Sequence, residues 1–190
     1  MHQLRPDMKQ EHKNKDILKI WEAIQKGNQK AFDEFYLLFV RQLYNYGHKL
    51  TSNTPLVEDC IQELFINLWN NKASIHFRSS VKHYLLLSFR RLLIKKLEQS
   101  KIPSKLSSPL RIQKPDIETD LDQLEQEVQK KRVIKAVRQL PKRQKEALFL
   151  KYYENMDYDE IGAIMDINKG AVYKLISKGV RKLREMLTLF

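Results

Sequence analysis

The chain has 190 residues and carries 35 Lys and Arg against 23 Asp and Glu, a formal net charge of +12 at pH 7. This excess indicates a polyanionic partner, and nucleic acid is favoured over an anionic membrane surface. No apolar run approaches the ~20 residues of a membrane-spanning helix, so we expect no direct membrane insertion. Residues 1–15 are polar and lack the apolar core of a secretory signal. The single Cys60 excludes an intramolecular disulfide and favours a reducing, cytoplasmic location.

Helical periodicity dominates the sequence. Only 5 Gly are present, and apolar residues recur mostly three or four positions apart, which predicts an all-α protein. In the first half the pattern predicts helices over residues 16–25, 30–50, 56–70 and 80–97. Thr54 and Pro55 are the expected N-cap and first-turn proline of the third. The apolar stripes of the first two helices contain Ile17, Ile20, Trp21 and Ile24, and then Phe32, Phe35, Tyr36, Phe39 and Leu43.

The predicted helix 56–70 has two contrasting sides. Its apolar side carries Val57, Ile61, Leu64 and Leu68, with Cys60 beside it as an expected core residue. The opposite side combines acidic, amide and large apolar side chains, namely Asp59, Gln62, Glu63, Ile66 and Trp69. This composition suits a protein partner with a basic, partly apolar helix. The alternative is that Trp69 only covers a neighbouring helix.

Between Glu63 and Glu98 the chain has basic residues but no acidic residue, which indicates a polyanion-binding surface in the first domain. Lys82 lies in this stretch, and Tyr84, Ser88, Arg91 and Lys95 share one helix face that suits unpaired bases and their phosphates. The preceding loop, residues 70–80, offers side chains able to stack on or hydrogen-bond a flipped base: Asn71, Ser74, His76 and Phe77. The alternative is a solvated basic face.

Proline and serine interrupt the helical pattern after residue 98. We therefore expect a polar tail over 1–15, a helical domain over 16–98, a flexible linker over 99–122 and a second helical domain over 123–190. The linker begins basic and becomes acidic from Asp116 onward. It is interpreted as a solvated tether, or alternatively as a segment that threads a channel in a large partner.

The second domain contains a predicted helix-turn-helix. Leu140 and Pro141 open a helix expected to be lined by Ala147, Leu148 and Tyr152. Asp157 and Glu160 form a predicted capping box for a short helix with Ile161, Ile164 and Met165. A turn over residues 166–168 follows, with Asn168 as the expected cap of the last helix.

The last helix is predicted to carry its positive charge on one side. Lys169 begins it, and Gly170, Tyr173, Lys174, Ser177, Lys178 and Arg181 lie together on that side. The opposite side has Val172, Leu175, Ile176, Gly179 and Leu183, where Gly179 would permit a close helix approach. Such a helix suits the major groove of DNA. The alternative is a helical hairpin with a basic exterior.

No catalytic or cofactor-binding pattern emerges. There is no glycine-rich phosphate loop, and the five His show no metal-ligand spacing with carboxylates or Cys60. We therefore expect a non-enzymatic protein without cofactor or metal.

Three motifs together resemble bacterial RNA polymerase sigma factors of the extracytoplasmic-function (ECF) group. Residues 56–69 resemble the helix of sigma region 2 through Asp59, Gln62-Glu63, Phe65 and Leu68-Trp69. Residues 80–85 with Arg90-Arg91 resemble the segment that melts the minus-ten element. Residues 140–144, 157–162 and 170–174 resemble region 4. The chain departs from the family pattern at Asp166, where Gly is common, at Gly162, where Ala is common, and at Leu175 and Val180, where Arg is common.

The resemblance implies a sigma factor that binds core RNA polymerase and recognises two promoter elements. It assigns Asp59, Gln62, Glu63 and Trp69 to the clamp of the largest polymerase subunit; the flap is a further expected contact. It also assigns the loop 70–80 to a flipped minus-ten base, and Lys169, Gly170, Tyr173, Lys174, Ser177 and Lys178 to the minus-thirty-five duplex. An anti-sigma factor is an expected partner. The alternatives are a stand-alone helix-turn-helix regulator and an RNA-binding protein.

Overall fold

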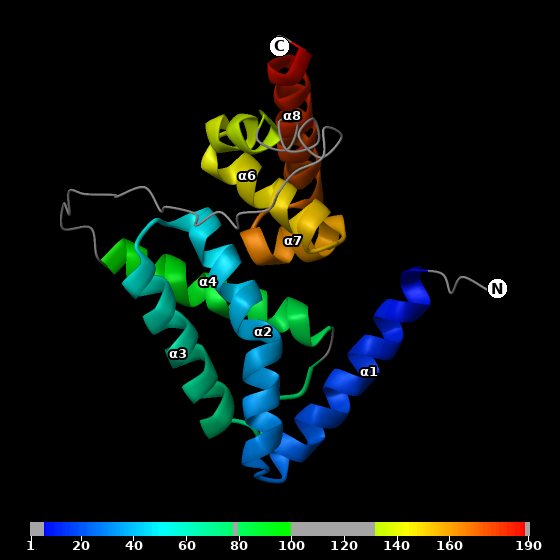
Figure 1. Ribbon diagram of the computed structural model, residues 1–190, viewed down its shortest axis with the longest axis vertical. Helices are drawn as coiled ribbons and strands as arrows, with labels where there is room; N and C mark the ends of the chain where they lie inside the picture. Colours follow the sequence, from blue (N-terminus) through cyan, green and yellow to red (C-terminus); the bar gives the residue numbers. More distant parts are fainter. Residues whose placement is uncertain (1–5, 78–79, 100–131, 189–190) are drawn as a thin grey trace, which may run out of the picture. The chain divides into compact units, whose positions relative to one another are not determined.

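The computed structural model describes residues 6–77, 80–99 and 132–188, which form helices and no strand (Figure 1). The chain divides into two compact units, Met1–Lys105 and Leu106–Phe190. These observations confirm the predicted all-α class with two helical domains. The predicted linker lies, after Gln99, outside the described residues. No helix within the described ranges is both long and apolar enough to cross a bilayer.

Four helices make up the first unit: α1 (Pro6–Gln25), α2 (Gln29–Leu50), α3 (Thr54–Asn70) and α4 (Val81–Gln99). Helix α2 packs against the other three. The predicted helices are present, but α1 begins at Pro6 rather than at residue 16, because its polar first turns contain good helix formers such as Lys, Gln and Glu. The N-cap of α3 is Asn53, not Thr54. The Asn53 Oδ1 accepts from the Leu56 amide at 3.2 Å, and Pro55 occupies the first turn as predicted.

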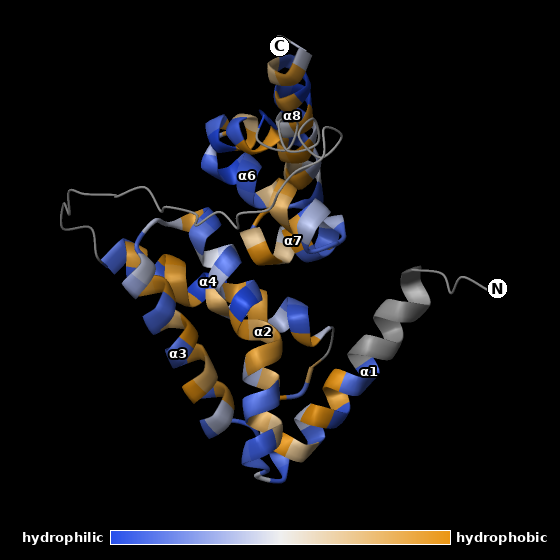
Figure 2. Ribbon diagram, in the orientation of Figure 1, coloured by the Kyte–Doolittle hydropathy of each residue, from blue (hydrophilic) through white to orange (hydrophobic). Residues whose placement is uncertain are grey.

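Aromatic side chains fill the core of the first unit. Phe35 is fully buried, and its ring centroid lies 5.4 Å from Trp21, 4.9 Å from Phe39 and 6.3 Å from Phe65. Cys60 is a buried core residue as predicted, and burial raises the pKa of its thiol. Figure 2 shows both apolar and polar residues along these helices, as expected for helices that bury one side and expose the other.

The second unit packs two short helices against a long one. Residues 132–139 are helical and precede α6 (Lys142–Leu148), the π-helical turn η1 (Phe149–Tyr153), α7 (Tyr158–Met165) and α8 (Lys169–Thr188). Both α6 and α7 contact α8. A Cβ added to Gly179 would lie 2.9 Å from Leu148 Cδ1, so this glycine permits the predicted close approach of α6.

The prediction that Tyr152 packs on the inner side of its helix with Ala147 and Leu148 was wrong. Ala147 and Leu148 are buried as expected, but Tyr152 is 64% exposed. The cause is η1, in which the Glu154 amide donates to the Phe149 carbonyl at 3.1 Å, five residues back. This wider turn changes the angular position of every following side chain relative to an α-helix.

Truncation of the aromatic core should unfold the first unit selectively. We expect Phe35→Ala to lower its free energy of unfolding by about 3–5 kcal/mol, because a buried ring is lost and a cavity remains. Leu37→Ala is the matched control on the same helix, since Leu37 is 72% exposed, and its effect should stay within about 0.5 kcal/mol. Urea unfolding followed by tryptophan fluorescence measures this unit alone, because Trp21 and Trp69 both belong to it. Equal midpoints for the two variants would contradict the described packing.

Candidate nucleic-acid and protein interfaces

The short helix α7 is held in place by side-chain caps. Asp157 Oδ1 accepts from the amides of Asp159 and Glu160, both at 2.8 Å, and Glu160 Oε2 accepts from the Asp157 amide at 3.0 Å. This confirms the predicted capping box. It also satisfies amides that the first turn of a helix leaves without backbone partners.

The turn between α7 and α8 is also held by specific hydrogen bonds. Asp166 adopts a left-handed conformation with φ 54°, and the amides of Asp166 and Ile167 both donate to the Gly162 carbonyl. Asn168 Oδ1 then accepts from the Ala171 amide at 2.8 Å, which confirms the predicted cap of α8. The start and direction of α8 are thus fixed by hydrogen bonds on both sides of the turn.

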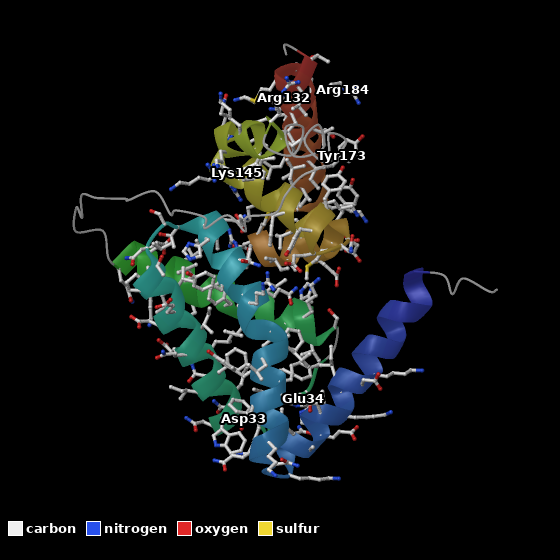
Figure 3. The ribbon with its side chains drawn as sticks, in the orientation of Figure 1. Asp33, Glu34, Arg132, Lys145, Tyr173 and Arg184 are labelled. Atoms are coloured by element: carbon white, nitrogen blue, oxygen red, sulfur yellow. The ribbon has the colours of Figure 1, made fainter. Side chains whose placement is uncertain are left out.

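Helix α8 presents the side that the sequence predicted. Val172, Ile176 and Gly179 are buried, and Leu175 and Leu183 are half-buried. The seven candidate DNA-contacting residues are all exposed: Lys169, Gly170, Tyr173, Lys174, Ser177, Lys178 and Arg181. In Figure 3 the labelled Tyr173 side chain projects away from α8. The exposed side carries amine, guanidinium, hydroxyl and phenol groups, which are able to contact phosphates and base edges.

Two members of this set have ion-pair partners among the described residues, and the ring of a third, Tyr173, lies 6.2 Å from that of Tyr158 of α7. Lys169 Nζ lies 2.7 Å from Asp159 Oδ2 of α7, and this hydrogen bond raises the pKa of Lys169. Arg181 Nε lies 3.9 Å from Glu185 Oε1, a looser contact one turn along α8.

On α3, the five candidate protein-contacting residues differ in exposure. Asp59, Gln62 and Ile66 are exposed. Glu63 is half-buried and pairs with Lys96 of α4 at 2.5 Å, a hydrogen bond that raises the pKa of Lys96. Glu63 therefore also joins α3 to α4 within the unit.

Trp69 packs against a neighbouring helix, as in the alternative considered from sequence, and its contact with a protein partner stays a prediction. It is half-buried, with its ring centroid 5.0 Å from Phe32 of α2, and the Lys72 ammonium lies 4.1 Å from the ring centroid. It also borders a groove of about 770 Å³ between α2 and α3. The α3 side of this groove includes Gln62 and Ile66.

Sequence reasoning missed the α2 side of this groove. Phe32, Asp33 and Tyr36 line it together with the α3 residues, and Figure 3 labels Asp33 at the first turns of α2. Phe32 and Tyr36 were assigned to the apolar stripe of α2. Their incomplete burial depends on how α2 and α3 cross, which periodicity does not reveal.

The loop before α4 is anchored by α1. Trp21 Nε1 donates to the Ile75 carbonyl at 3.3 Å, and Gln25 Nε2 donates to the carbonyls of Lys72 at 3.1 Å and Ile75 at 3.2 Å. Sequence reasoning gave α1 no part in this site. The pairing of residues some fifty positions apart has no local signal.

The candidate loop residues have distinct environments. Asn71, Ser74 and His76 are exposed, and Ser74 Oγ donates to the Asn71 carbonyl at 2.9 Å. Phe77 differs, because its ring lies 4.9 Å from Trp21 and 5.2 Å from Tyr84 and is half-buried. In this structure Phe77 therefore packs against aromatic side chains of the same unit.

A pocket of about 260 Å³ lies where α3, the loop and α4 meet. It brings together three of the predicted residues, Asn71, Tyr84 and Ser88, and adds Asn67 of α3, which sequence reasoning missed. The spacing of Asn67 and Asn71, one helical turn apart, was an available signal. Arg91 and Lys95 are exposed and Lys82 is half-buried, and none of the three lines the pocket.

Comparison with known proteins gives matches to the second unit and to most of the chain. Residues 130–183 match the family described as Sigma-70, region 4. The chain is 38% identical over 58 residues to the RNA polymerase sigma factor FliA of Yersinia enterocolitica, covering 30% of this chain but only 25% of that relative. It is 24% identical over 186 residues to the ECF RNA polymerase sigma factor SigW of Bacillus subtilis, covering 90% of this chain and 96% of SigW.

The fold also matches a solved structure. The sigma factor RpoE of Bartonella quintana, crystallised in complex with the anti-sigma factor NepR, superposes with a TM-score of 0.62 at 21% identity. The match covers 84% of this chain and 98% of that one. At this identity the similarity establishes the helical fold.

The tight turn before α8 should not tolerate a side chain at Gly162. A Cβ there would lie 2.8 Å from the Ile167 carbonyl oxygen, a backbone atom that must move. We expect Gly162→Ala to destabilise the second unit by about 1–3 kcal/mol. Hydrogen exchange of peptides covering α7 and α8 measures the loss.

Gly170→Ala is the matched control, because its added Cβ meets only Asn168 Oδ1 at 3.4 Å. Its exchange should match that of the wild type or be slower, since alanine favours the helix. Unchanged exchange in Gly162→Ala would show that the turn is looser than described.

Proposed function

We propose that this chain, a member of the sigma factors of the ECF group, binds core RNA polymerase and directs it to promoters. Promoter selection would rest on recognition of the minus-ten and minus-thirty-five elements. The observation that carries the proposal is the exposed basic side of α8, fixed by a capped turn within the segment that matches sigma-70 region 4.

In this proposal the second unit binds the minus-thirty-five element as duplex. Lys174 and Lys178 lie one turn apart on the exposed side of α8, so both reach the same groove. Lys169, Gly170, Tyr173, Ser177 and Arg181 complete the contact surface. Lysines neutralise phosphates, and the hydroxyl, phenol and amine groups approach base edges in the major groove.

The first unit is proposed to bind the minus-ten element after melting. The pocket between α3 and α4 offers the amides of Asn67 and Asn71, the ring of Tyr84 and the hydroxyl of Ser88. A flipped base needs stacking and hydrogen bonds to its Watson–Crick edge, and these groups supply both. Arg91 and Lys95 are exposed on the same helix and would follow the backbone phosphates, with Lys82 near its start.

The groove between α2 and α3 is the proposed polymerase contact. Its walls carry Phe32, Tyr36, Ile66 and Trp69, and Asp33 lies among them. Apolar walls with a carboxylate suit a partner helix that carries apolar and basic side chains. We assign this partner to the clamp of the largest polymerase subunit, with the flap as a second contact.

Further parts of the proposal follow from family membership. RpoE of B. quintana was crystallised with an anti-sigma factor, and we propose that this chain also has an anti-sigma partner. It would act in the cytoplasm, without catalysing a reaction itself. The domains are proposed as region 2 over 16–98 and region 4 over 123–190, with a linker over 99–122.

The polymerase contact is tested by co-elution of the full chain with core RNA polymerase. We expect the wild type to co-elute and Asp59→Ala/Trp69→Ala to bind about thirtyfold more weakly, since a buried aromatic anchor typically dominates such an interface. Glu58→Ala, an exposed carboxylate on the same helix, is the control and should bind normally. Circular dichroism checks that the double variant is folded. A wild type that binds duplex DNA but not core polymerase would instead indicate a stand-alone regulator.

The DNA contact is tested with Lys174→Ala and Lys178→Ala. Each should weaken binding of the polymerase-bound chain to promoter DNA about tenfold, because a groove contact is lost, without changing polymerase binding. Lys19→Ala is the control, since Lys19 is exposed on α1 in the other unit. If both α8 variants have the promoter activity of the wild type, α8 is not the helix that contacts promoter DNA.

A further inference from the structure

The amino-terminal end of the exposed side of α8 differs electrostatically from its middle. Lys169 is held by Asp159 at 2.7 Å, whereas within the described residues no carboxylate pairs with Lys174 or Lys178. The Asp159–Lys169 pair joins α7 to the first residue of α8 and is solvent-exposed, with side-chain exposures of 70% and 63%.

Asp159 is not required to cap α7. The capping box uses the side chains of Asp157 and Glu160, and Asp159 contributes only its amide to it. An exposed ion pair also stabilises a fold very little. Apart from its favourable place in the acidic first turn of α7, the carboxylate of Asp159 therefore has little structural role beyond its effect on Lys169.

The position of Asp159 affects any DNA that reaches α8. Lys169 cannot give its full charge to a phosphate while a carboxylate shares its ammonium, and that carboxylate itself repels phosphates. Asp157 adds to the negative field at the same ammonium. This loss of electrostatic attraction weakens the binding of every DNA sequence, because phosphates are present in all of them.

We propose that Asp159 weakens phosphate binding at the start of α8 and thereby sets how much base contact a duplex needs before it binds. The inference rests on the proposed function, since it requires α8 to be the DNA-contacting helix. DNA bound only through phosphates must displace Asp159 from Lys169 without compensation. A cognate duplex bears the same cost and offsets it through base contacts along the rest of α8, so it stays bound at a protein concentration at which DNA held only through phosphates does not.

The test compares two duplexes with the full-length chain by fluorescence anisotropy. One is a random-sequence duplex, and the other is a duplex selected by the wild type from a random pool. Asp159→Asn keeps the side-chain shape and removes the charge. We expect it to bind the random duplex about two- to fivefold more tightly, the range of one exposed ion pair. The salt dependence should steepen by about 0.9 in log–log slope, for one added phosphate contact.

The selected duplex should gain by a similar factor, because Lys169 is proposed to meet a phosphate in both complexes. Lys169→Ala in the Asp159→Asn background should abolish the gain, because the freed ammonium is its source. Asp16→Asn is the charge-matched control, since Asp16 pairs with Lys19 at 3.5 Å on α1, and it should leave both affinities unchanged.

Two results would overturn the proposal: unchanged affinity of Asp159→Asn for the random duplex, or weaker binding to the selected duplex. The second would mean that Asp159 orients Lys169 toward a base. Lys174→Ala, measured in parallel, separates this failure from failure of the proposed function. If Lys174→Ala weakens binding while Asp159→Asn has no effect, only the role of Asp159 is wrong. If neither variant changes binding, α8 is not the DNA-contacting helix, and both proposals fail.

Discussion

The paired hydrogen bonds from the Asp166 and Ile167 amides to the Gly162 carbonyl determine how the second unit presents α8. They close the turn so tightly that the Ile167 carbonyl oxygen comes within 2.8 Å of where a Cβ at Gly162 would lie. Asp166 accepts the left-handed conformation, for which aspartate is better suited than most residues other than glycine. The exposed side of α8 depends on this turn, because a rotation of α8 about its axis would bury lysines and expose Val172 and Ile176.

Most of the second unit was predictable because its determinants are local. The capping box of Asp157 and Glu160 and the cap by Asn168 involve residues at most three positions apart. The two sides of α8 follow from helical periodicity alone. The exception is Tyr152. A π-helical turn breaks the 3.6-residue periodicity on which the prediction of helix faces depends. The residue types at positions 149–153 do not indicate such a turn.

The first unit was predictable as a set of helices but not as a site. Periodicity identified buried residues of α2, such as Phe35 and Phe39, and three exposed residues of α3, namely Asp59, Gln62 and Ile66. It could not show that Phe32 and Asp33 line one groove with Trp69, or that Asn67 lines a pocket with Tyr84. These features arise from the crossing of helices far apart in sequence. The residue types were visible, but their proximity required the tertiary structure.

The anchoring of the loop before α4 has an evolutionary consequence. Trp21 and Gln25 of α1 fix the carbonyls of Lys72 and Ile75, and Trp21 also supports the ring of Phe77. In the proposed function this loop meets the melted strand, whereas the two α1 side chains support it from behind. Substitutions at Trp21 or Gln25 would reshape the loop without removing a DNA contact. In the proposed function, promoter preference can therefore diverge through inherited changes in a helix to which no promoter contact is assigned.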